Sequence, residues 1–173
     1  MSKSRSQKQA GIELRELLLG SPKWTLAAAE SLTAGRVQAR IAAVSGASDY
    51  FLGGITAYSL ALKVKHLGVD RAAAKRVNSV SAEVAEQMAR GASMLFGASV
   101  GVATTGYAEP SPKDGVTGPF AWWAIAFRGA RGKFTLRHGR IECPGCSRIE
   151  TQEIVADAVL AELTEWLREL RSR

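Results

Sequence analysis

The sequence predicts an α/β fold: a single-domain, layered α/β sandwich in which a mixed sheet is flanked by helices. Short apolar runs alternate with helix-like segments along most of the chain, which is typical of parallel strands joined by helical crossovers. Two apolar runs near residues 120–141 are separated by a short glycine-containing turn, which predicts an antiparallel hairpin and therefore a mixed sheet. The 173 residues contain no internal repeat and no low-complexity linker, so one domain is expected.

Glycine, proline and serine delimit the elements expected in the first half of the chain. The first helix ends at Gly20-Ser21-Pro22, because glycine suits the position after a C-cap and proline cannot continue the helix. A short apolar run bounded by turn residues then indicates a buried strand. The elements expected in this half are a helix over 11–19, a strand over 24–29, a helix over 33–44, a strand over 51–58, a helix over 60–67 and a basic helical stretch over 71–77.

Two serines mark the starts of the helices expected in the second half. Ser81 precedes a strongly amphipathic segment, and its side chain can cap the first turn. Ser147 and Glu150 match a capping box, in which the two side chains satisfy exposed N–H groups reciprocally. The other elements expected are a strand over 98–104, a Pro/Gly-rich loop over 107–119, hairpin strands over 120–127 and 133–141, and a final helix after 147.

Composition indicates a soluble globular protein, with 46% hydrophobic, 23% charged and 7% aromatic residues. No apolar run is long enough to cross a bilayer and the N-terminus is polar, so a cytoplasmic location is expected. The net charge of +7 is concentrated at the chain ends: without five terminal residues, 18 basic residues remain against 16 acidic ones. We therefore expect residues 1–10 to form a flexible basic tail and residues 11–173 the folded domain. We do not expect a nucleic-acid partner.

The two cysteines form a single Cys143-Pro-Gly-Cys146 motif. One pair cannot supply the four ligands of a tetrahedral zinc site, and His138 and His66 do not complete one. The motif predicts two reduced cysteines in a tight turn. A redox pair is the alternative, because such pairs favour the start of a helix. No metal and no cofactor is expected.

Ser31 and Lys63 are the residues that most clearly suggest chemistry. Ser31 follows an apolar strand and precedes a helix, where exposed N–H groups stabilise developing negative charge. Lys63 lies just after a second strand-to-helix junction that also carries Tyr58. A lysine held neutral by its surroundings can activate a serine as a nucleophile. The alternatives are a serine that only caps its helix, a solvated lysine and a packing tyrosine.

Two neighbouring features could serve the same chemistry. Glu30 is either a general acid or base or a partner in helix capping. Thr105 and Gly106 end a strand at the edge where α/β sheets bind their ligands. Each of these signals is common when taken alone.

Four ordered motifs become specific when they are taken together. Residues 29–35 read A-E-S-L-T-A-G, residues 54–63 read G-I-T-A-Y-S-L-A-L-K, residues 80–89 read V-S-A-E-V-A-E-Q-M-A, and residues 104–106 read T-T-G. This set resembles the CinA C-terminal-domain family, which includes the competence-damage-inducible proteins and the nicotinamide mononucleotide deamidases. The resemblance covers residues 14–170.

The resemblance implies an amidohydrolase with Ser31 as nucleophile, Lys63 as its base and Tyr58 as an assisting or positioning group. The implied reaction belongs to pyridine nucleotide salvage in NAD metabolism: hydrolysis of the nicotinamide mononucleotide carboxamide to nicotinic acid mononucleotide and ammonia. It also implies a small-molecule substrate and a homodimer or higher homo-oligomer. The substrate-binding residues that it implies are Glu30, Thr33, Gly35, Thr105, Gly106 and Arg148.

The chain also departs from the family pattern. Leu60 replaces an asparagine, Ala34 replaces a glycine, and residues 107–123 differ from the usual glycine-rich loop. Glu109 stands where the family has glycine and places a negative charge near the expected phosphate. Two alternatives therefore stay open: hydrolysis of another small amide, and a ligand-binding module that kept the fold without the reaction.

Overall fold

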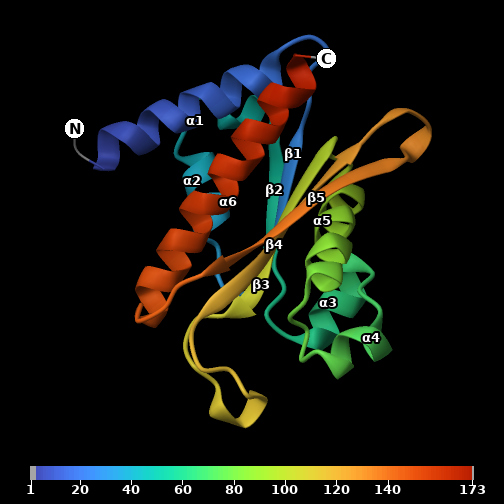
Figure 1. Ribbon diagram of the computed structural model, residues 1–173. Helices are drawn as coiled ribbons and strands as arrows, with labels where there is room; N and C mark the ends of the chain where they lie inside the picture. The colour runs from blue at the N-terminus through green and yellow to red at the C-terminus, as the bar shows by residue number, and fades with distance from the viewer. Residues whose placement is uncertain (1–2, 173) are drawn as a thin grey trace.

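The fold centres on a five-stranded mixed sheet, seen in a computed structural model that describes residues 3–172 (Figure 1). The strand order is β2-β1-β3-β4-β5. β1 runs parallel to β2 and to β3, whereas the β3–β4 and β4–β5 pairs are antiparallel, which confirms the predicted mixed sheet. The strands are β1 (Leu26–Glu30), β2 (Phe51–Thr56), β3 (Val100–Tyr107), β4 (Phe120–Arg128) and β5 (Phe134–Glu142).

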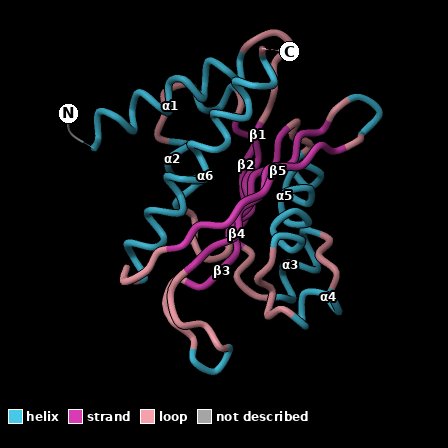
Figure 2. The backbone as a smooth tube through the Cα atoms, viewed as in Figure 1, coloured by secondary structure: helices cyan, strands magenta, loops and turns pink. Residues whose placement is uncertain are grey.

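Helices cover both faces of the sheet, as the sandwich prediction requires (Figures 1 and 2). One face carries α1 (Lys3–Leu19), α2 (Arg36–Ala42) and α6 (Arg148–Arg171), and the other carries α3 (Leu60–Leu67), α4 (Arg71–Arg76) and α5 (Ala82–Phe96). Parallel strands need crossover connections. The segment containing α2 supplies the connection from β1 to β2, and the α3–α5 segment supplies the one from β2 to β3.

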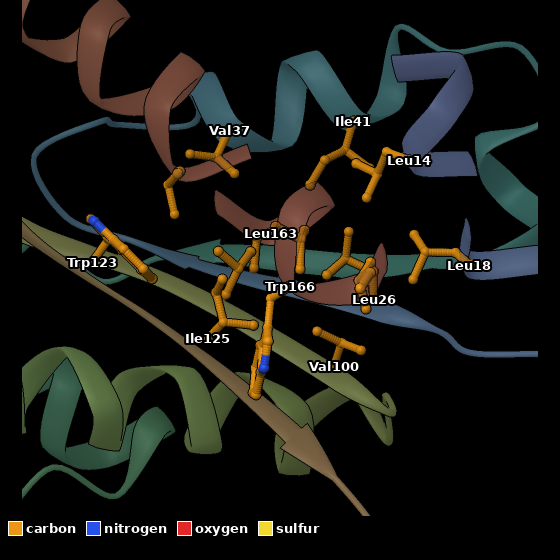
Figure 3. Close-up of a cluster of buried hydrophobic side chains, with 14 of the residues drawn as sticks. Leu14, Leu18, Leu26, Val37, Ile41, Val100, Trp123, Ile125, Leu163 and Trp166 are labelled. Atoms are coloured by element: carbon orange, nitrogen blue, oxygen red, sulfur yellow. The ribbon is translucent and has the colours of Figure 1, made fainter. Parts of the chain in front are cut away.

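Large apolar side chains fill the space between the sheet and the layer formed by helices α1, α2 and α6 (Figure 3). Burying each such side chain contributes about 1.5–3 kcal/mol relative to leaving it exposed. This layer therefore holds the first and last helices of the chain against the sheet. Labelled members of the cluster are Leu14, Leu18, Leu26, Val37, Ile41, Val100, Trp123, Ile125, Leu163 and Trp166.

The opposite face is packed mainly with alanine, because α5 approaches the sheet closely. Ala89 and Ala92 of α5 are buried against alanines of β1, β3 and β4. Gly101 of β3 marks the tightest approach: a Cβ atom there would lie 1.9 Å from the carbonyl oxygen of Ala89. Small residues are therefore required where the helix crosses the strand.

We expect Gly101→Ala to destabilise the protein by about 1–3 kcal/mol, because the added methyl forces α5 away from β3. Urea unfolding followed by circular dichroism measures the change. Gly118→Ala is the matched control, since no heavy atom lies within 4 Å of a Cβ at that position. Equal unfolding midpoints for Gly101→Ala and the wild type would contradict the close-packing account.

The first helix is longer than the sequence pattern predicts. We expected a helix over 11–19 after a basic tail, whereas α1 begins at Lys3. Lysine, arginine, glutamine and alanine are good helix formers, so this segment continues the helix without an apolar periodicity. Within residues 3–172, no helix combines the length and the apolar character needed to span a membrane.

Candidate active site

The candidate active site lies where the chain changes direction across the sheet. From β1 the chain crosses to β2 on one side, and β3 then pairs with β1 on the other side. Ligands of α/β sheets bind at such a switch point, outside the carboxyl ends of the strands. Ser31 follows β1 directly, and its N–H donates to the carbonyl of Thr104 in β3 at 3.0 Å.

Ser31 and Lys63 meet at this point, as the sequence analysis required. Ser59 caps α3 by accepting from the N–H of Leu62, and Lys63 follows in the first turn. The Nζ atom of Lys63 lies 3.0 Å from the Oγ atom of Ser31. It also donates to the carbonyl oxygen of Tyr58 at 3.3 Å. Both residues are buried, with Ser31 8% and Lys63 2% exposed.

Burial changes the protonation of Lys63. Desolvation lowers the pKa of its amine from 10.5 to about 8, because the charged form loses its hydration. Within residues 3–172, no carboxylate pairs with this amine to oppose that effect. A fraction of the amine is therefore neutral at ordinary pH and can accept the proton of the adjacent hydroxyl.

Glu30 lies behind the nucleophile and caps α2. Its carboxylate, on a residue only 1% exposed, accepts from the N–H groups of Gly35, Val37 and Gln38 at 2.9, 3.1 and 2.9 Å. It also accepts from the Thr33 hydroxyl at 2.6 Å. Of the two roles that the sequence left open for Glu30, its position in the structure corresponds to that of a helix-capping partner.

This arrangement corrects the expected start of the second helix. The helix expected from residue 33 begins at Arg36, because Gly35 adopts a left-handed conformation (φ 95°) at the N-cap. Three residues expected at the substrate, Glu30, Thr33 and Gly35, are not among those that line the cleft, and their part in substrate binding stays a prediction. Thr33 is fully buried and its hydroxyl lies 2.7 Å from that of Thr104. Consecutive residues of a strand point to opposite sides, so Ser31 faces the cleft while Glu30 faces α2.

An open cleft of about 490 Å³ extends from the Ser31–Lys63 pair. The predicted residues Tyr58, Thr105, Gly106 and Arg148 line it. The β3–β4 loop forms another part of its wall and extends away from the sheet in Figure 1. Further polar residues of the cleft come from α4 and the turn after it (Lys75, Asn78 and Ser79) and from the β3–β4 loop (Ser111, Lys113 and Asp114).

A strained turn between α4 and α5 brings two of these residues to the cleft. Asn78 and Ser79 both have positive φ values, 47° and 63°. The hydroxyl of Thr105 donates to the Ser79 carbonyl at 2.8 Å, and the Asn78 amide donates to the Tyr107 hydroxyl at 2.8 Å. The only available sequence signal was an Asn-Ser pair after a basic helix, and it did not indicate contact with β3.

Arg148 connects two walls of the cleft. It is the first residue of α6, and its guanidinium donates to the Tyr58 hydroxyl at 3.4 Å and forms an ion pair with Glu109. The hydrogen bond and the charge of Arg148 lower the pKa of the Glu109 carboxyl. Tyr58 contacts Lys63 through its main-chain carbonyl. The Tyr58 hydroxyl accepts from Arg148 instead, so the assisting or positioning role of Tyr58 stays a prediction.

The cysteine pair lies just before α6. Cys143 is buried, Cys146 is partly buried, and neither forms a disulfide. Burial, followed by the nearby Cys146 and Glu142, raises the pKa of the Cys143 thiol and keeps it protonated. The capping box of Ser147 and Glu150 is present as predicted. This geometry favours the interpretation of two reduced cysteines in a turn.

The fold and the site define a class of small α/β proteins with a buried serine–lysine pair at the switch point of a mixed sheet. The sequence model of the CinA C-terminal domain matches residues 11–167, and the chain belongs to this family.

Similar proteins agree with that assignment. A CinA-like protein of Salinibacter ruber is 38% identical over 80% of this chain, and one of Chlorobium limicola is 36% identical over 88%. The chain covers only 32% and 36% of the length of these two relatives. A CinA superfamily structure from Klebsiella pneumoniae has the same fold, with a TM-score of 0.84, 24% identity, and coverage of 94% of this chain and 98% of that one.

Proposed function

We propose that the protein is an amidohydrolase that converts the carboxamide of nicotinamide mononucleotide to nicotinic acid mononucleotide and ammonia. The observation that carries the chemistry is the buried, partly neutral amine of Lys63 at 3.0 Å from the Ser31 hydroxyl. The choice of substrate rests on the family resemblance of the four motifs.

The proposed reaction proceeds through an acyl-enzyme. The neutral Lys63 amine accepts the proton of Ser31 while the serine oxygen attacks the amide carbon. The resulting ammonium then protonates the departing nitrogen, and the C–N bond breaks to release ammonia. The same amine then takes a proton from a water molecule, whose oxygen attacks the ester carbon. The bond between that carbon and the serine oxygen breaks, the Lys63 ammonium returns a proton to the serine oxygen, and nicotinic acid mononucleotide is released. Every proton transfer uses a group that lies at the observed dyad.

Main-chain N–H groups beside Ser31 are suited to stabilise the oxyanion of this reaction. The N–H groups of Gly35, Val37 and Gln38 are occupied by Glu30. The N–H groups of Leu32 and Thr33 have no hydrogen-bond partner among the described residues, and Leu32 lines the cleft. We assign the Leu32 N–H as the first oxyanion donor, because donors that are already in place stabilise developing charge without reorganisation.

Purified protein incubated with nicotinamide mononucleotide tests the proposal. We expect ammonia and nicotinic acid mononucleotide in equal amounts, measured by a coupled ammonia assay and by chromatography. Ser31→Ala should fold normally by circular dichroism and release neither product, because the attacking oxygen is gone. Absence of product from the wild type, or unchanged release by Ser31→Ala, would contradict the proposal.

A second candidate function is hydrolysis of another small amide. The observation that favours it is the Glu109–Arg148 ion pair, which places a resident carboxylate on a cation of the cleft. A panel of nucleosidic and non-nucleosidic carboxamides, assayed for ammonia, separates the two candidates. Binding of a nucleotide without ammonia release from any amide would instead identify a ligand-binding module.

A further inference from the structure

The charges of the cleft are divided unequally between paired and unpaired groups. Arg148 is held by Glu109 from the β3–β4 loop and by the Tyr58 hydroxyl from the β2–α3 loop. Lys63, Lys75 and Lys113 also line the cleft, and none of the three forms an ion pair within residues 3–172. Asp114 is a second carboxylate of the lining, and it accepts from the Ser111 hydroxyl. Among these cations of the cleft, Arg148 is therefore the one that already forms an ion pair with a carboxylate of the protein, that of Glu109.

A ligand anion and Glu109 would compete for the same guanidinium. Arginine binds carboxylates and phosphates through the same planar set of N–H donors. Glu109 already occupies part of that set, and its own negative charge repels a second anion placed nearby. An uncharged ligand meets neither obstacle.

From this geometry we infer that Glu109 is a specificity-determining residue, which disfavours substrates carrying an anionic group at Arg148 relative to uncharged ones. The inference rests on the proposed amide hydrolysis at Ser31 and not on the choice of nicotinamide mononucleotide as substrate, and it concerns the group of the substrate that lies at Arg148. A phosphate binds at Arg148 only after it displaces the Glu109 carboxylate. Removing the charge of Glu109 therefore favours the nucleotide over the nucleoside.

Two substrates that differ only in this group provide the test. Nicotinamide mononucleotide and nicotinamide riboside share the amide and the ribose, and only the first carries a phosphate. We expect Glu109→Gln to raise the ratio of their kcat/KM values, nucleotide over nucleoside, by about tenfold, the order expected from one like charge at close range. A ratio cancels general losses of activity, so a merely structural role for Glu109 would not move it.

Four further variants show which residue causes the effect. Glu142→Gln removes an exposed glutamate that pairs with Arg140, and it should leave the ratio unchanged. Arg148→Gln in the Glu109→Gln background should cancel the gain, because the phosphate then loses its partner. An unchanged ratio in Glu109→Gln, together with a fall in Lys75→Gln or Lys113→Gln, would place the anion at the lysines and overturn the inference.

Binding measurements keep the inference testable if the protein hydrolyses neither compound. Titration calorimetry on Ser31→Ala, with and without Glu109→Gln, gives the same nucleotide-to-nucleoside ratio without turnover. A tenfold rise in that ratio supports the role of Glu109 even where the proposed function fails. An unchanged ratio contradicts the inference even where amide hydrolysis is confirmed.

Discussion

Replacing Lys63 by methionine is expected to lower the rate of amide hydrolysis by about a thousandfold or more, because a serine without its base is a weak nucleophile. Methionine fills a similar volume and cannot accept a proton. Lys65→Met, on the exposed side of the same helix, is the matched control and should keep the wild-type rate. Steady-state ammonia release at saturating substrate measures both variants. A Lys63→Met enzyme with near-normal turnover would exclude the lysine as the base.

The pH dependence gives this prediction a second measurement. Only the neutral amine accepts a proton, so kcat/KM should rise with pH and level off above the Lys63 pKa of about 8. The residual activity of Lys63→Met should lack that inflection. A wild-type profile that falls as pH passes through 8 would indicate a protonated lysine acting as an acid.

The free energy of unfolding should also depend on the protonation of the Lys63 amine. The folded protein releases the Lys63 proton near pH 8, whereas the unfolded chain holds it until about 10.5. Between these values the unfolded state binds more protons, so the contribution of Lys63 to stability rises with pH. Below pH 8 the buried charge costs at most about 3 kcal/mol. Urea unfolding at pH 7 and pH 10 should show this rise in the wild type relative to Lys63→Met.

Glu30→Ala is expected to be the most destabilising single change near the site, by about 3 kcal/mol or more. It removes a buried carboxylate that accepts three main-chain N–H bonds and one hydroxyl bond. Each buried donor left without a partner costs about 1–3 kcal/mol. The start of α2 would lose its cap, and the turn that carries Ser31 would lose its support.

Chemical denaturation checks this expectation directly. Glu142→Ala serves as the control, because that glutamate is exposed and should change stability by no more than about 0.5 kcal/mol. A Glu30→Ala midpoint that coincides with the control would show that solvent replaces the carboxylate without loss.

Local signals predicted much of the fold. The helix over 60–67 was predicted with its observed bounds, since Ser59 and Gly68 stand at its two caps. Ser81 and Ser147 cap their helices as expected, because a cap depends on residues within one turn. The mixed sheet follows from the alternation of elements and from the hairpin.

The cleft was harder to predict because it is made by contacts between distant segments. Ser31 and Lys63 were brought together only by combining the two junctions with the family resemblance. Glu30 was expected at the substrate, yet the side to which it points depends on where β1 ends. Ser79 reaches the cleft through its bond to Thr105, 26 residues away, and no local pattern in the sequence encodes that bond.

The two sides of the cleft are built differently. The hydroxyl and the amine rest on a central strand and a capped helix, while the facing wall is the exposed β3–β4 loop that carries Glu109 and Lys113. Ala108 of that loop is buried in a hydrophobic cluster, whereas Glu109 and Lys113 are exposed, so replacements at the exposed positions disturb the core least. Changes at the exposed positions of that loop would therefore alter the lining of the cleft and leave the Ser31–Lys63 pair in place.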